Sequence, residues 1–200
     1  MTAHHLDDIA ADALLNGERW RILKAAHHVL ELPGLYAIYG NATAWLDLEL
    51  EPELHRPLYV GKTEESLVKR DLDDHFVAGP TGKARTGGST VRRSFAALLR
   101  DQLDLHAVPR NLDNPGHFNK YGLSQGGDER LTEWMHSHLE LAVWFKPDGS
   151  AERLVDVETA VIKRFAPPIN IQKNPRKLGR LSRARSEMKI EAQQWRPEHR

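Results

Sequence analysis

Six residues of this chain carry functional groups that are common in active sites, and their order along the sequence suggests one site. Two are tyrosines beside glycines, in Gly34-Leu35-Tyr36 and Tyr59-Val60-Gly61, and both segments have the pattern of β-strands. The others supply a guanidinium, an imidazole, a carboxylate and an amide, in the order Arg70, His75, Glu158 and Asn170. Such groups can accept a proton, bind an oxyanion or coordinate a hard cation. Each residue alone is commonplace, whereas the ordered series favours a catalytic site.

The elements that must position these residues are a strand pair and a helix. Strands are predicted for residues 35–39 and 56–61, which would pair antiparallel and bring the two tyrosines together. Glu158 lies in a predicted helix, 155–165, that ends at Pro167-Pro168, and Asn170 follows this double proline. The other predicted elements are a helix over 64–76, a helix over 89–105 capped by Ser89 or Thr90, a helix over 131–138 and a strand over 139–145.

The remaining segments divide the chain into three parts. Residues 1–32 are predicted to form an N-terminal helical extension with one or two helices, 33–172 the main domain, and 173–200 a basic tail that is either a charged helix or a loose arm. Within the main domain the sequence predicts a protruding loop or a short extra strand at 40–55, a glycine-rich loop at 79–88 and an irregular insertion at about 107–127.

The order of these elements and the motifs within them resemble the GIY-YIG nuclease family. The strongest stretch runs from Tyr59 to Phe95 and contains YVGKT, KR, HF and STVRRSF, within a resemblance that extends roughly from Gly34 to Asn170. It implies an α/β (α+β) fold, in which a small, mainly antiparallel sheet is flanked by helices. It also implies a metal-dependent endonuclease that hydrolyses phosphodiester bonds in DNA.

The resemblance assigns a role to most of the six residues. Glu158 would bind a single divalent cation, Mg²⁺ or Mn²⁺, because a carboxylate is a hard oxygen ligand and Mg²⁺ keeps several waters of its own. Arg70 would bind the non-bridging phosphate oxygens. Tyr36 would accept a proton from the attacking water, and Tyr59 would hydrogen-bond the phosphate. Asn170 is grouped with the substrate-binding residues, although its expected task is to order the strand or loop behind the site.

The proton chemistry of Tyr36 and His75 needs further conditions. A phenol has a pKa of about 10, so Tyr36 can act as a base only if cations lower that pKa, and Arg70, Lys62 and the metal are the candidates. His75 follows Arg70 by five residues, which is about 140° around an ideal helix. Either the helix carries a bulge or His75 is displaced from the phosphate. Its expected role is proton transfer or orientation of Tyr59.

Basic residues are concentrated in two segments that suit the backbone of a nucleic acid. Residues 79–100 contain five basic and no acidic side chains, and residues 171–200 contain nine basic and three acidic ones. A solvated surface explains either block alone equally well. The expected substrate-binding residues are Lys62, Lys83, Arg85, Arg92 and Arg93, with the segment from Lys173 to Arg185 extending the grip. The expected partner is DNA, with double-stranded DNA favoured, and a homodimer would allow two single-site chains to cut both strands.

Composition excludes several other classes of protein. The 200 residues include no cysteine, which rules out disulfides, a thiolate nucleophile and cysteine-ligated zinc. No apolar run approaches the ~18 residues of a membrane span, so a cytoplasmic protein is expected. Gly61-Lys62-Thr63 does not complete a phosphate-binding P-loop, because Arg56 stands where the first glycine is required. His136 and His138 have no second cluster to complete a metal site.

Two functions remain open at this point. One is a compact endonuclease of restriction or phage-defence type. The other is a nucleic-acid-binding module that keeps the fold but has little or no catalysis. The presence of Tyr36, Tyr59, Arg70 and Glu158 together favours the enzyme, because loss of function would be expected to remove at least one of them.

Overall fold

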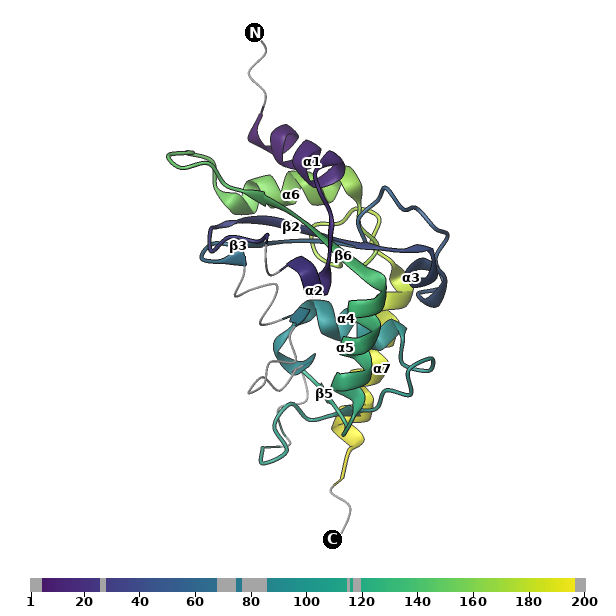
Figure 1. The fold of residues 1–200 in the computed structure, drawn as a ribbon. Coiled ribbons are helices and arrows are strands. Elements are labelled where there is room, and N and C mark those ends of the chain that lie inside the picture. Colours follow the sequence, from purple (N-terminus) through teal and green to yellow (C-terminus); the bar gives the residue numbers. More distant parts are fainter. Residues whose placement is uncertain are drawn as a thin grey trace.

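The computed structural model of the chain describes residues 5–25, 28–67, 75–76, 86–114, 116 and 120–196. Figure 1 shows its architecture, a small sheet between two layers of helices. The elements in chain order are α1 (Leu6–Asn16), β1 (Trp20–Arg21), α2 (Ile22–Ala25), β2 (Gly34–Gly40), α3 (Ala42–Asp47), β3 (Tyr59–Thr63), the 3₁₀ helix η2 (Thr86–Gly88), α4 (Thr90–Leu98), β4 (Ala107–Val108), β5 (Gly122–Leu123), α5 (Gly127–His138), β6 (Leu139–Phe145), α6 (Leu154–Phe165) and α7 (Gly179–Gln194).

The centre of the fold is a four-stranded antiparallel sheet with the order β1-β6-β2-β3. β2 lies between β6 and β3, and all seven of its residues are buried. Because side chains alternate along a strand, Tyr36 and Ile38 project to one face of the sheet. Leu35, Ala37 and Tyr39 project to the other face. β3, which carries Tyr59, forms one edge of the sheet.

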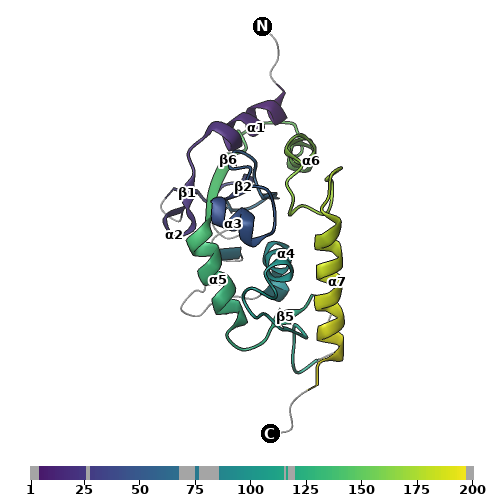
Figure 2. The same cartoon turned by 90° about the vertical axis from the view of Figure 1, so that its right-hand side faces the viewer.

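Helices cover both faces of this sheet (Figure 1). α1 and α6 lie on one face, where Leu14 and Val161 join the core around Leu35 and Ala37. α2, α4 and α5 lie on the other face, the face of Tyr36. Figure 2 shows α7 running alongside α4. This arrangement confirms the predicted fold class, a small antiparallel sheet flanked by helices.

The segment 40–55 differs from its prediction as a loop or an extra strand, because it contains helix α3. Oδ1 of Asn41 accepts a hydrogen bond from the backbone N–H of Ala44 at 2.9 Å and so caps the helix. Trp45, one turn into the helix, is fully buried. The four acidic residues of this segment follow the helix or lie at its end.

Other boundaries also differ from the predicted ones. α4 begins after the predicted cap Ser89 but ends at Leu98, well before residue 105. α5 begins at Gly127, earlier than residue 131, and the segment predicted as an irregular insertion also contains the paired strands β4 and β5. The N-terminal segment contains two helices and the strand β1, whose two residues are too few for an alternating pattern to reveal.

The segment predicted as a basic tail includes α7, which packs on the domain. Leu181, Met188 and Ala192 of this helix are buried in the core that also contains Tyr36 and Phe95. Throughout the described ranges, none of the helices is both long enough and apolar enough to cross a lipid bilayer.

Candidate active site

Tyr36 and Tyr59 project from the same face of neighbouring strands. In the β2–β3 register Tyr36 lies opposite Gly61 and Ile38 opposite Tyr59, so that the two ring centroids are 6.0 Å apart. A Cβ atom on Gly61 would lie 2.5 Å from Cζ of Tyr36, which is too close for any real contact. Glycine is therefore required at position 61, because a side chain there would displace the phenol of Tyr36.

His75 connects the phenol of Tyr36 to the first turn of α4. Its Nε2 lies 2.9 Å from the Tyr36 hydroxyl oxygen, and its Nδ1 lies 2.8 Å from Oγ of Ser89. His75 and Phe76 have a π-helical backbone. Arg70 lies outside the described residues, so the two alternatives for its spacing from His75 stay open. The hydrogen bond between Nε2 and the phenol oxygen pairs His75 with Tyr36. The two roles expected from the sequence, proton transfer or orientation of Tyr59, stay predictions.

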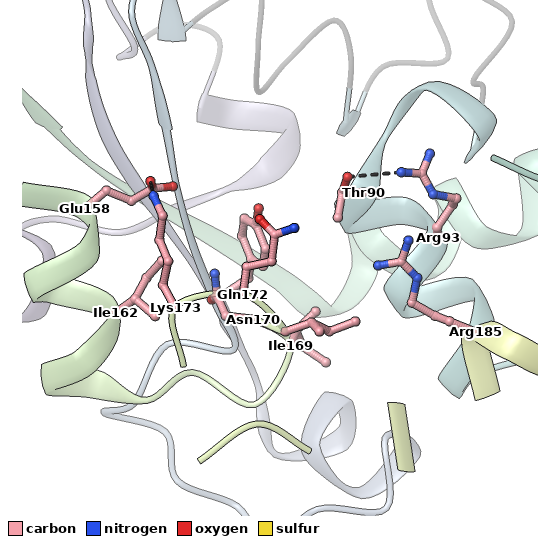
Figure 3. Close-up of a pocket in the computed structure, with 11 residues that line it drawn as sticks. Thr90, Arg93, Glu158, Ile162, Ile169, Asn170, Gln172, Lys173 and Arg185 are labelled. Carbon is pink, nitrogen blue, oxygen red and sulfur yellow. Dashed lines mark hydrogen bonds and ion pairs between the residues drawn. The ribbon is translucent and has the colours of Figure 1, made fainter. Parts of the chain in front are cut away.

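A cavity of about 360 Å³ opens beside Tyr59 at the β3 edge of the sheet. Figure 3 shows its lining: Glu158 and Lys173 lie at one end, Asn170 in the middle, and Arg93 and Arg185 at the other end. The side chains come from α6, from the segment that follows α6, from α4 and from α7. Folding therefore brings a carboxylate and two guanidinium groups into one cavity with a phenol.

Glu158 enters this cavity from the middle of α6. Its neighbour Val157 is buried against the sheet, and the Glu158 side chain is 12% exposed. Oε2 of Glu158 lies 2.5 Å from Nζ of Lys173. Lys173 has a left-handed backbone conformation, with φ of 62°, which costs free energy in a residue with a side chain. The carboxylate is thus held by a cation from a strained segment of backbone.

Asn170 fixes the edge strand to the segment after α6. Its Oδ1 accepts from the backbone N–H of Val60 at 2.9 Å, and its Nδ2 donates to the carbonyl of Val60 at 2.8 Å. The side chain is buried and takes the place of a neighbouring strand for this one residue. Because Val60 is next to Tyr59, this clamp also fixes the backbone that carries Tyr59.

Arg93 is almost entirely buried, with 5% of its surface exposed, and faces the cavity from α4. It donates from Nη1 to the carbonyl of Gly87 at 2.7 Å and from Nη2 to Oγ1 of Thr90 at 3.0 Å. Burial, and then the nearby charge of Arg185, lower the pKa of Arg93 to about 10. The guanidinium groups of Arg93 and Arg185 repel each other, and an anion bound between them would offset this repulsion.

Comparison with known proteins places the chain in a family. Residues 34–187 match the model of the GIY-YIG catalytic domain, which is about three quarters of the chain. The chain belongs to the GIY-YIG family. The same comparisons found no matching curated protein and no matching solved structure. Membership supports a nuclease-type function with nucleic acid as the substrate.

GIY-YIG nucleases generally depend on a divalent metal, and Glu158 fits such an ion. Within the part of the chain that the structure describes, no three His, Cys, Asp or Glu side chains gather as a ready-made metal site. A single carboxylate beside a roomy polar cavity suits Mg²⁺, which keeps several waters and is often completed by substrate phosphates. The amine of Lys173 would have to leave Oε2 of Glu158 for the ion to bind there.

Arg92 is not a DNA-contacting residue, contrary to the sequence-based prediction. Its side chain is 1% exposed. Nη1 donates to the carbonyl of His75 at 3.0 Å, and Nη2 donates to Asp128 and to Oγ1 of Thr132. Every described partner of Arg92 lies inside the protein. The guanidinium therefore joins α4, α5 and the backbone at His75, and cannot reach a nucleic acid.

Replacing this buried cation is expected to destabilise the fold. Arg92→Met leaves the carboxylate of Asp128 without its cation, which should lower the free energy of unfolding by about 3–5 kcal/mol. Urea denaturation measures this loss. Arg100→Met is the matched control, because Arg100 is 36% exposed and pairs loosely with Glu191 at 3.6 Å; its loss should cost less than about 1 kcal/mol. Equal losses in the two variants would contradict the structural role of Arg92.

Lys62 is directed away from the phenols. It lies opposite Leu35 in the register, on the other face of the sheet from Tyr36, and its Nζ lies 2.5 Å from Oε1 of Glu64. Lys62 is also not among the described residues that line the cavity. The structure therefore gives no support for Lys62 as the cation next to Tyr36. The other predicted residues, Arg70, Lys83 and Arg85, lie outside the described residues.

Three residues of the site received no individual role from the sequence. Lys173 and Arg185 entered only as the limits of a basic segment, and Ser89 only as a helix cap. The sequence did contain one usable signal for Arg185. Leu181, Met188 and Ala192 have the spacing of one face of a helix, which indicates that the helix containing Arg185 packs on the domain. No local pattern indicates that the backbone turn at Lys173 brings its amine to Glu158.

Proposed function

We propose that the protein is a metal-dependent endonuclease that hydrolyses phosphodiester bonds in DNA. We propose further that this endonuclease is of restriction or phage-defence type. The observation that carries the proposal is the cavity itself, which joins Glu158, Tyr59 and two arginines next to the buried Tyr36–His75 pair. A phosphodiester is an anion whose hydrolysis needs a base for water, cations at the phosphate oxygens and a means of orienting the group. In this proposal the cavity residues supply the cations and the orienting groups, and the buried Tyr36, which is not among the described lining residues, supplies the base.

In this mechanism each side chain has a separate task. Tyr36 accepts a proton from the attacking water, and the hydrogen bond between Tyr36 and His75 orients the phenol oxygen. Tyr59 hydrogen-bonds the scissile phosphate. Arg93 and Arg185 bind phosphate oxygens at the end of the cavity away from Glu158. A divalent cation held by Glu158 would supply positive charge to the phosphate and the leaving oxygen.

Cleavage of DNA in the presence and absence of metal tests the proposal. Supercoiled plasmid and a diverse pool of double-stranded DNA are incubated with the protein in Mg²⁺ or Mn²⁺, and then with EDTA. Metal-dependent nicks or double-strand cuts are expected, and their ends report the polarity and the recognition sequence. If the protein binds these DNAs but does not cut any of them in either metal, the binding module is the better description.

A substitution of Arg185 tests the predicted DNA binding by the basic segment without removing α7. Deleting the segment would remove three core residues of α7 and so disturb the fold. Arg185→Ala should instead weaken DNA binding by about tenfold and reduce the slope of log affinity against log salt by about one, the loss of one phosphate contact. Binding to a labelled duplex at several salt concentrations measures both quantities.

The control for this variant is Arg183→Ala on the same helix. Arg183 is exposed and is not among the described lining residues of the cavity. Its loss should change the DNA affinity by less than about threefold, as for a solvated surface charge. An unchanged salt slope in Arg185→Ala would show that Arg185 does not contact the DNA backbone.

A further inference from the structure

A chain of hydrogen bonds runs from the N-terminus of α4 to the phenol of Tyr36. The backbone N–H of Arg92 donates to Oγ of Ser89 at 3.1 Å, Oγ lies 2.8 Å from Nδ1 of His75, and Nε2 of His75 lies 2.9 Å from the Tyr36 oxygen. Ser89, His75 and Tyr36 are each only 1% exposed. Because these three side chains are shielded from water, the hydrogen bonds among them determine which atoms carry the protons.

The proton of Ser89 sets the direction of this chain. A serine hydroxyl has one proton to donate and two lone pairs, and one lone pair of Ser89 already accepts from Arg92. Among the described residues, the acceptor within hydrogen-bond distance of Oγ is Nδ1 of His75. Ser89 therefore donates to Nδ1, which must carry a lone pair.

The tautomer of His75 follows from this direction. A neutral imidazole with a lone pair on Nδ1 carries its proton on Nε2, and Nε2 faces the Tyr36 oxygen. A charged imidazolium would place a second N–H against Ser89 and leave the serine proton without an acceptor. The Nε2–H group of His75 is thus a donor to Tyr36.

We infer that Ser89 is a positioning residue that fixes His75 as the Nε2–H tautomer, so that His75 donates a hydrogen bond to the Tyr36 oxygen. This inference rests on the proposed function, in which Tyr36 takes a proton from water. To accept that proton, the Tyr36 phenol must first have lost its own proton to solvent, and a fixed Nε2–H donor stabilises the resulting phenolate oxygen. Arg92 supports the arrangement from behind, because its Nη1 donates to the carbonyl of His75. The first turn of α4 therefore holds both the ring and the backbone of this histidine.

The tautomer can be observed directly in the unmodified protein. Long-range ¹H–¹⁵N NMR spectra of the full chain with ¹⁵N-labelled histidine separate protonated from unprotonated ring nitrogens. The chain has 11 histidines, and the signal that disappears in His75→Gln identifies His75. The expected result is an unprotonated Nδ1 and a protonated Nε2. A protonated Nδ1 overturns the inference. This measurement needs neither metal nor DNA, so it is independent of whether the protein cleaves DNA.

Two substitutions of Ser89 separate its donor role from its role as a helix cap. Ser89→Thr keeps a hydroxyl that can both cap α4 and donate to Nδ1, so the tautomer should persist and turnover should stay within about threefold of the wild type. Ser89→Asp also caps a helix but can only accept, so Nδ1 should become protonated. Its kcat should fall about 10²-fold, as for the loss of one preorganised donor, with little change in KM for DNA or in Tm.

The comparison of these two variants decides whether the donor matters. Wild-type tautomer and turnover in Ser89→Thr, with a changed tautomer and a lower kcat in Ser89→Asp, support the inference. A changed tautomer in Ser89→Asp with the kcat of Ser89→Thr overturns it. If Ser89→Asp does not fold, the NMR spectrum of the wild type still decides the tautomer. Absence of cleavage by the wild type would contradict the proposed function, and would be seen separately from the NMR result.

Discussion

Tyr36→Phe is expected to slow DNA cleavage about 10³-fold while leaving DNA affinity nearly unchanged. The substitution removes only the hydroxyl that would accept the proton from water. The ring keeps its place opposite Gly61, where a glycine leaves the space that the phenol fills. Single-turnover cleavage at saturating enzyme measures the rate, and binding of a duplex in EDTA measures the affinity.

Tyr39→Phe is a close control for Tyr36→Phe. Tyr39 is on the same strand and equally buried, but it projects to the opposite face and donates to the carbonyl of Leu14 at 2.8 Å. Burial raises the pKa of Tyr39 to about 12, so it is not a base near neutral pH. Its replacement should cost about 1 kcal/mol of stability and leave the cleavage rate unchanged. If Tyr36→Phe cleaved at the rate of Tyr39→Phe, Tyr36 would not be the base.

The elements that carry the site could be predicted because each has a strong local signal. The strand of Tyr36 is a run of aliphatic and aromatic residues that begins and ends at glycines, and the helix of Glu158 has an apolar face and ends before two prolines. The order of these elements, together with the motifs, was enough to predict the fold class.

Which of two adjacent arginines is buried and which lines the cavity could not be predicted in the same way. Arg92 and Arg93 have the same chemistry and neighbouring positions, yet Arg92 is enclosed by the protein and Arg93 lines the cavity. The difference arises from α5, which is remote in the sequence and supplies Asp128 and Thr132 to Arg92. A charged pair in a sequence shows that cations are present, but only the packed fold shows which cation is accessible to a substrate.

Lys173 illustrates a second limit of sequence patterns. Its amine reaches Glu158 through a left-handed backbone at a residue that is not glycine, a conformation that sequence rarely reveals. The clamp of Asn170 on Val60 lies just before it and holds the same segment against the edge strand. The arrangement of Glu158 therefore depends on contacts made by the segment after α6 and not on α6 alone.

Glu158→Gln is expected to reduce metal-dependent cleavage by ~10³-fold or more, because the variant would lose several kcal/mol of transition-state stabilisation by the metal. Glutamine has nearly the same shape, so the cavity should keep its form while losing the anionic ligand. Two measurements check this: the cleavage rate as a function of Mg²⁺ or Mn²⁺, and the binding of Mn²⁺ to the protein without DNA. DNA affinity in EDTA should stay equal or rise, since a negative charge near the phosphate is removed and Lys173 loses its partner.

Asp156→Asn on the same helix is the matched control for charge and position. Asp156 is an exposed residue of the first turn of α6 and pairs with Arg153, with 2.7 Å between Oδ2 and Nε. Its replacement removes the same charge two residues from Glu158, so general effects of net charge on DNA binding should be alike in the two variants. Only Glu158→Gln should lose Mn²⁺ binding and cleavage. Equal cleavage by both variants at saturating metal would show that Glu158 does not hold the ion, and the catalytic cation would have to be bound by other groups.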